Sequence, residues 1–169
     1  MSVDGATLGA VICVAFSGVW GVIGASGLPR QWRMWVLGSS IVVSVATIVW
    51  RLLPHVSPGS GVFRGDVYFE AVAFEAVGIV VAVWLLRRLG HREYILPVVG
   101  FIVGLHFVGL WKATDLFVFV WTAIGMCVVS LIAIWLPGPS IGRAIDVRRA
   151  ITGFGCMLVL WTTGVFGLR

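Results

Sequence analysis

"YFEAVAFEAVGIVVAVWLLR", residues 68–87, is an almost wholly apolar run, interrupted only by two glutamates and closed by an arginine. A helix rises about 1.5 Å per residue, so a run of about 20 residues crosses the roughly 30 Å hydrocarbon layer of a membrane. The stretch therefore predicts a membrane-spanning helix that carries Glu70 and Glu75 inside it. An ionisable side chain at that depth is costly unless it is paired, neutralised or facing a cavity, so both residues need an explanation.

The composition of the whole chain is that of an integral membrane protein. It is 60% hydrophobic and only 11% charged, far from the balance of a soluble domain. None of its apolar runs has the period-two alternation of a barrel strand. We therefore expect residues 1–169 to form one all-α domain, a bundle of six transmembrane helices. The other five runs lie near 6–26, 34–53, 94–112, 116–136 and 148–167.

The first run and the cysteines call for no processing or metal chemistry. Asp4 precedes the run at 6–26, which is also too long for the core of a signal peptide, so we expect this helix to be retained. Cys13, Cys127 and Cys156 lie singly in three different runs. That spacing favours small packing residues over a disulfide framework or a zinc site. No metal and no cofactor are expected.

The distribution of cations predicts the orientation in the membrane, because Lys and Arg concentrate in cytoplasmic loops. Six helices bring both termini to one side, which carries only Arg51, Arg64, Lys112 and Arg169. The termini are therefore expected outside the cytoplasm, in a multi-pass protein of a bacterial cell membrane. The net charge of +5 reflects this asymmetry, and no nucleic-acid partner is expected. The opposite side carries Arg30, Arg33, Arg87, Arg88, Arg92, Arg143, Arg148 and Arg149.

The depths of the polar residues follow from folding the chain back on its short loops, because antiparallel helices rise equally. A turn near Gly90 brings Glu75 level with His106, and later turns add Trp121 and Trp161 to the same layer. We expect Glu75, His106 and Glu70 to be catalytic. Glu70 would act as a relay one turn nearer the surface, level with Trp111 and Lys112. The residues expected to bind the substrate are Trp121, Trp161, Trp111, Phe74 and Phe107.

Each of these residues also has a structural interpretation. Trp121 and Trp161 could pack in the core, while Trp111 lies near a segment end, where tryptophan anchors in the interface. Glu70 could form an ion pair with Lys112. Glu75 is harder to explain structurally, although a hydrogen bond to His106 is an alternative to a functional role.

An acid, a histidine and several aromatic rings in an apolar cavity suit one kind of chemistry. A carboxyl group in such surroundings stays protonated at neutral pH and donates a proton. Aromatic faces stabilise cations. The set favours protonation of an apolar substrate followed by carbocation rearrangement, as in isoprenoid cyclisation. The sequence has no aspartate-rich motif for magnesium and diphosphate, and His55 and His91 fall in loops, which disfavours a bis-histidine haem.

Glu75 and the stretch "REYILPVVGFIVGLHFVGLW", residues 92–111, carry a resemblance. They are similar to small six-helix bacterial membrane proteins with a glutamate in the third helix and a GLHF motif in the fourth. The chain also resembles the bacterial membrane-bound terpene cyclases of the drimentine type. That resemblance implies an enzyme acting on prenylated indole or diketopiperazine substrates, with Glu75 and His106 in its active site. Where "LPLA" is expected after GLHF, this chain has Val108 to Trp111, which removes a proline and adds an aromatic ring.

Two other functions fit the same residues. A small proton-coupled transporter would exchange a proton on Glu75 for a lipophilic cation. The sequence has no evident inverted repeat, which counts against a transporter, although small transporters can form such a repeat as homo-oligomers. A non-catalytic membrane subunit would use the Glu75–His106 contact only for stability. For both the cyclase and the transporter, the expected partners are a lipophilic small molecule and the lipid bilayer.

Overall fold

The computed structural model describes residues 5–52, 64–136 and 146–167, and these are almost entirely helical. A short 3₁₀ turn, η1 (Arg92–Tyr94), precedes the fourth helix, and a π-helical turn, η2 (Thr163–Gly167), follows the sixth. The described residues contain no strand, which confirms the predicted all-α class. The six helices are α1 (Gly5–Ser26), α2 (Arg30–Leu52), α3 (Gly65–Arg88), α4 (Ile95–Thr114), α5 (Val118–Trp135) and α6 (Val147–Thr162).

All six helices are long and apolar enough to cross a membrane, α6 together with η2, so the chain is a multi-pass membrane protein. Two boundaries differ most from those of the apolar runs. Helix α2 starts at Arg30 because the carbonyl of Pro29 accepts the N–H groups of Trp32 and Arg33 at 3.0 and 3.1 Å, which builds a polar first turn. The regular part of α6 ends at Thr162, where threonine hydroxyls bond carbonyls of the preceding turn and compete with the helical amides.

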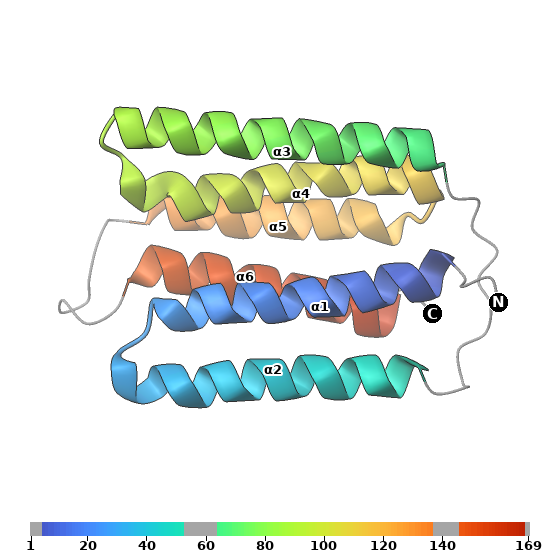
Figure 1. The fold of residues 1–169 in the computed structure, drawn as a ribbon, viewed down its shortest axis with the longest axis horizontal. Helices are drawn as coiled ribbons and strands as arrows, with labels where there is room; N and C mark the ends of the chain where they lie inside the picture. The colour runs from blue at the N-terminus through green and yellow to red at the C-terminus, as the bar shows by residue number, and fades with distance from the viewer. Residues whose placement is uncertain (1–4, 53–63, 137–145, 168–169) are drawn as a thin grey trace.

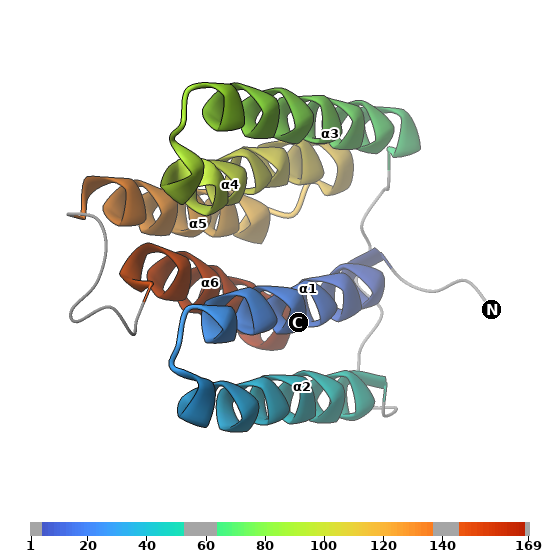
Figure 2. The same cartoon turned by 60° about the vertical axis from the view of Figure 1, so that its left-hand side comes forward.

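The helices lie side by side in the order α2, α1, α6, α5, α4, α3 (Figures 1 and 2). Each one packs chiefly on its neighbours in that row, and α1 with α6 and α4 with α5 are the most extensive pairs. Helix α2 packs mainly on α1, and α3 mainly on α4. Two helices that follow each other in the chain, α2 and α3, therefore lie at opposite edges of the molecule.

The core lies in the middle of the row. It includes Trp20 of α1, Phe107 of α4, Phe119 and Met126 of α5, and Leu160 of α6, all buried. Helix α3 buries no residue completely. Helices α1 and α6 approach so closely that a Cβ at Gly153 would collide with the backbone of Gly24, a contact that only small residues permit. Cys13 and Cys156 belong to this core, as predicted, and all three cysteines are unpaired.

The turn between α3 and α4 centres on Gly90, as the folding-back of the sequence required. Gly90 has φ of +80°, a conformation that glycine adopts without steric penalty. The N–H of His91 bonds the carbonyl of Leu86 at 2.9 Å and closes the end of α3. The two helices then run antiparallel from a fixed point, which sets the levels of their side chains.

The two ends of the bundle differ in charge. The end that carries the α1–α2 and α3–α4 turns, here named the basic end, holds seven described arginines: Arg30, Arg33, Arg87, Arg88, Arg92, Arg148 and Arg149. The end that carries the termini, here named the terminal end, has Arg64 and Lys112 among the residues whose side chains are described. Asp4, His55, Arg143 and Arg169, and the side chain of Arg51, lie outside that part of the structure.

Candidate functional site

The two principal candidates, Glu75 and His106, meet between α3 and α4. The Oε2 atom of Glu75 lies 3.2 Å from Nδ1 of His106. Their side chains retain 21% and 9% of their exposed surface, respectively. The prediction that they lie at one level is confirmed, and the structure adds that they face each other.

The contact has the distance of an ion pair without the geometry of an aligned hydrogen bond. Nδ1 of His106 is buried and has no hydrogen-bond partner among the described residues. One proton added to a carboxylate and a neutral imidazole makes the pair neutral overall. The pair is then either a carboxylic acid beside a neutral imidazole or a carboxylate beside an imidazolium. A neutral pair is far cheaper within a membrane than either ion alone. The two side chains can therefore hold one proton and still bond a third group.

An open groove of about 410 Å³ runs along α3 and α4 beside this pair. The volume falls within the range of small-molecule sites, roughly 300–1,000 Å³. Its polar lining comes from Glu70, Glu75, His106 and Lys112. The remaining lining is apolar: Val67, Ala71, Phe74, Ile102, Leu105, Val108 and Gly109.

Helical spacing and one glycine create this groove. On α3, Val67, Ala71 and Phe74 lie three or four residues apart and so share a face. On α4, a Cβ at Gly109 would collide with the side chain of Ala71, so the two helices approach closely there. The close contact beside Glu70 and Lys112 fixes the separation of the helices along the groove.

Glu70 and Lys112 both line the groove and both are exposed. They belong to the same part of the site, as their levels predicted. The alternative in which they form an ion pair is not seen, because no nitrogen–oxygen contact within 4.0 Å joins these two described side chains. Two long side chains that reach water gain little from pairing, since exposed ion pairs contribute roughly 0–1 kcal/mol.

The predicted phenylalanines separate into two environments. Phe74 lines the groove and its side chain is 79% exposed. Phe107 is buried, with its ring centroid 6.0 Å from that of His106 and 5.9 Å from that of Phe119. Phe107 thus supports His106 from the core and does not line the groove.

The three predicted tryptophans lie away from the groove. Trp111 and Trp121 stand edge-on to Phe117 between them, at centroid distances of 6.4 and 6.2 Å, and Trp121 is 64% exposed. Trp161 donates its Nε1–H to Thr47 Oγ1 at 3.1 Å and lines a separate cavity of about 210 Å³ between α1, α2 and α6. The expectation that Trp121 and Trp161 share a cavity with Glu75 is wrong, because equal depth does not fix the direction in which a side chain points.

Sequence reasoning missed Tyr68. Its ring stands edge-on to His106, with the centroids 6.1 Å apart. Tyr68 precedes Glu75 by seven residues, which is two helical turns, so the two residues lie on the same side of α3. The seven-residue spacing between Tyr68 and Glu75 is the feature of the sequence from which this position could have been predicted.

The fold and this site define a six-helix integral membrane protein with an acid–histidine pair between two of its helices. Comparison with protein-family models, with curated proteins and with solved structures finds no match to this chain. The resemblance to terpene cyclases stays a prediction. Within residues 5–52, 64–136 and 146–167, no three His, Cys, Asp or Glu side chains converge as a metal site would require.

Proposed function

We propose that the protein is a membrane-bound terpene cyclase that protonates the isoprenoid chain of a prenylated hydrophobic substrate, such as a prenylated indole or diketopiperazine. The observation that carries this proposal is the Glu75–His106 pair, which opens into a groove whose lining is otherwise mostly apolar. A proton held beside an apolar surface is what an alkene needs in order to react.

The reaction balances without a redox partner. The carboxyl of Glu75 gives its proton to one carbon of a double bond, which forms a C–H bond and leaves a cation on the neighbouring carbon. The next double bond attacks that cation and closes a ring. A carbon beside the final cation then loses a proton, which returns to the Glu75 carboxylate. The pair is anionic only while the substrate is a cation, and His106 orients the carboxyl group and helps to restore its proton between turnovers.

The position of the groove suits a substrate that arrives from the bilayer. Helix α3 is at the edge of the row, and Phe74 and Leu105 of the groove lining are exposed. A prenyl chain can enter from the side without crossing water. Glu70 and Lys112, nearer the terminal end, offer polar groups to the ring system of the substrate.

The distribution of aromatic rings favours a second candidate. Only Phe74 and His106 bring rings to the groove lining, while the tryptophans expected to shield a cation lie elsewhere. A small proton-coupled transporter needs no aromatic enclosure. It would use Glu75 to exchange a proton for a lipophilic cation, and a second copy packed on an edge helix would complete the pathway. In a non-catalytic subunit, the same pair would serve stability alone.

The proposed location is a bacterial cell membrane with the basic end in the cytoplasm and both termini outside. The seven described arginines at the basic end, against Arg64 and Lys112 at the terminal end, support this orientation. Cysteines introduced beside Arg30 and Arg92 should react only with reagents added from the cytoplasm. Labelling of these positions from outside intact cells would reverse the orientation.

An isotope experiment separates the two main functions. Purified protein in lipid nanodiscs is given a farnesylated indole in D₂O, and the products are resolved chromatographically because cyclisation leaves the elemental formula unchanged. Because the Glu75 carboxyl group exchanges its proton with the solvent between turnovers, we expect a cyclic isomer that carries one deuterium, and no product from Glu75→Gln. No conversion, together with proton movement in proteoliposomes when tetraphenylphosphonium is added, would reject the cyclase and favour the transporter.

A further inference from the structure

A second cavity, of about 590 Å³, lies at the basic end, away from the Glu75–His106 groove. The ends of α1 and α3 and the beginnings of α4 and α6 surround it. Side chains of isoleucine and leucine form its apolar part. Its polar part consists of Ser26, Arg87, Arg92, Glu93, Asp146 and Arg149.

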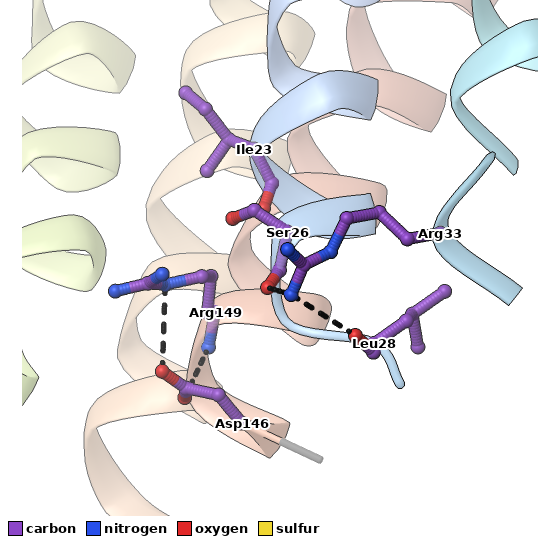
Figure 3. A network of polar contacts seen from close by, with 6 residues as sticks. All are labelled: Ile23, Ser26, Leu28, Arg33, Asp146 and Arg149. Atoms are coloured by element: carbon purple, nitrogen blue, oxygen red, sulfur yellow. Dashed lines mark hydrogen bonds and ion pairs between the residues drawn. The ribbon is translucent and has the colours of Figure 1, made fainter. Parts of the chain in front are cut away.

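The two acids of this cavity already have partners. Figure 3 shows Asp146 at the start of α6, where Oδ1 accepts the N–H of Arg149 at 3.1 Å and Oδ2 lies 3.4 Å from the guanidinium Nε of the same residue. Asp146 thereby caps α6. Glu93 has its Oε1 atom 3.6 Å from Nδ1 of His91, outside the lining.

The remaining arginines leave positive charge in the cavity. Neither Arg87 nor Arg92 has a carboxylate within 4.0 Å among the described residues. Arg33 adds a further cation at the margin, where it donates to the carbonyls of Ser26 at 3.0 Å and Leu28 at 3.3 Å (Figure 3). The cavity thus combines guanidinium groups with an apolar surface at the boundary of a membrane-spanning bundle.

We infer that this cavity binds a phosphate group, carried by an anionic lipid or by a soluble phosphate ester. A guanidinium group presents paired N–H donors that match two phosphate oxygens, and such charge-assisted hydrogen bonds are strong. Basic pockets between membrane helices suit lipid headgroups because acyl chains can lie on the adjacent apolar surface. Here Ile23, Ile95 and Leu96 provide that surface.

A bound phosphate would connect the two halves of the row. Ser26 and Arg149 belong to α1 and α6, whereas Arg87 and Arg92 belong to α3 and η1. Those halves meet otherwise mainly where α5 packs on α6. We therefore expect the ligand to raise the unfolding temperature as well as to bind.

The experiment uses the full chain in a non-ionic detergent, with phosphatidylglycerol, phosphatidylcholine or inorganic phosphate added. Native mass spectrometry measures binding and thermal unfolding measures stabilisation. The variant Arg87→Gln/Arg92→Gln should bind phosphatidylglycerol about tenfold more weakly than wild type, the scale of a lost charge-assisted hydrogen bond. Asp146→Asn should bind roughly threefold more tightly, since a negative charge leaves the lining while the helix cap is kept.

The matched control is Arg30→Gln/Arg88→Gln, which removes the same charge from the same end. Neither residue lines the cavity, and the guanidinium of Arg88 lies over the ring of Trp84 at 5.2 Å. This control should bind like wild type. Inorganic phosphate that binds where phosphatidylglycerol does not would assign the site to soluble phosphate esters. Equal loss in both double variants would overturn the inference. So would a lack of preference for phosphatidylglycerol or inorganic phosphate over phosphatidylcholine, because the phosphate of phosphatidylcholine is neutralised by its own choline group.

Discussion

The part of the chain that the structure describes contains two glutamate–histidine contacts, one within the membrane-spanning region and one at the basic end. Glu75 and His106 are separated by 3.2 Å, and their side chains are 21% and 9% exposed. Glu93 and His91 are separated by 3.6 Å, and their side chains are 46% and 58% exposed. The same two residue types thus occur at similar separations in opposite surroundings.

The comparison shows that environment, and not residue type, makes a candidate site. Water can replace either partner in the exposed contact, and such pairs contribute roughly 0–1 kcal/mol. The inner pair has little water to compensate it, so each side chain depends on the other and on whatever enters the groove. The exposed pair therefore serves as a control for the inner one.

Replacement of the inner acid should have the largest effect. Glu75→Gln keeps the shape of the side chain but cannot give up a proton, so the rate of substrate conversion should fall by roughly 10²–10⁴, the usual contribution of a general acid. Glu93→Gln should leave the rate unchanged. Initial rates of product formation test both variants. Equal losses of rate would show that the buried environment of Glu75 gives it no catalytic role that the exposed Glu93 lacks.

Removal of the inner histidine should lower both activity and stability. His106→Ala leaves the Glu75 carboxyl without its partner, at a cost of about 1–3 kcal/mol to the free energy of unfolding. His91→Ala should change neither quantity, because its partner reaches water. Denaturation in detergent micelles and turnover rates would be measured together. An unchanged unfolding midpoint for His106→Ala would contradict the dependence proposed here.

Separation of α3 from α4 should weaken the inner contact without removing either member. Gly109→Ala places a methyl group against Ala71, and overpacking of this kind costs about 1–3 kcal/mol. The double variant Ala71→Gly/Gly109→Ala should recover most of the stability, because it moves the methyl group to the opposite helix. Thermal unfolding of the two variants tests this. Failure of the second change to restore stability would place the damage elsewhere.

The smallest effect is expected at Glu70. It lines the groove but is exposed and makes no ion pair with Lys112, so Glu70→Gln should reduce turnover only a few-fold. Lys112→Gln should behave similarly if both residues contact the polar part of the substrate. Michaelis constants should change more than maximal rates. A loss as large as that of Glu75→Gln would make Glu70 the proton donor.

Much of the fold could be predicted from the sequence because only a few kinds of structure can span a membrane. The lengths of the apolar runs predict the six helices. Because the helices before and after the turn at Gly90 have the same rise per residue, the sequence also predicts that Glu75 and His106 lie at the same depth. Depth is a one-dimensional quantity, whereas direction around each helix depends on which helices are neighbours. The order of helices in the row leaves no local mark in the sequence. The sequence therefore does not reveal that Trp121 and Trp161 lie outside the groove lining.

The separation of α2 and α3 at opposite edges has a consequence for biogenesis. When α3 leaves the translocon, the helix made just before it lies on the far side of the finished molecule and offers it no packing surface. Glu70 and Glu75 thus enter the lipid before His106 does. The hairpin of α3 and α4 is the first nascent unit in which Glu75 has its partner, so a ribosome pause between these helices would expose an unpartnered acid to the membrane quality-control machinery.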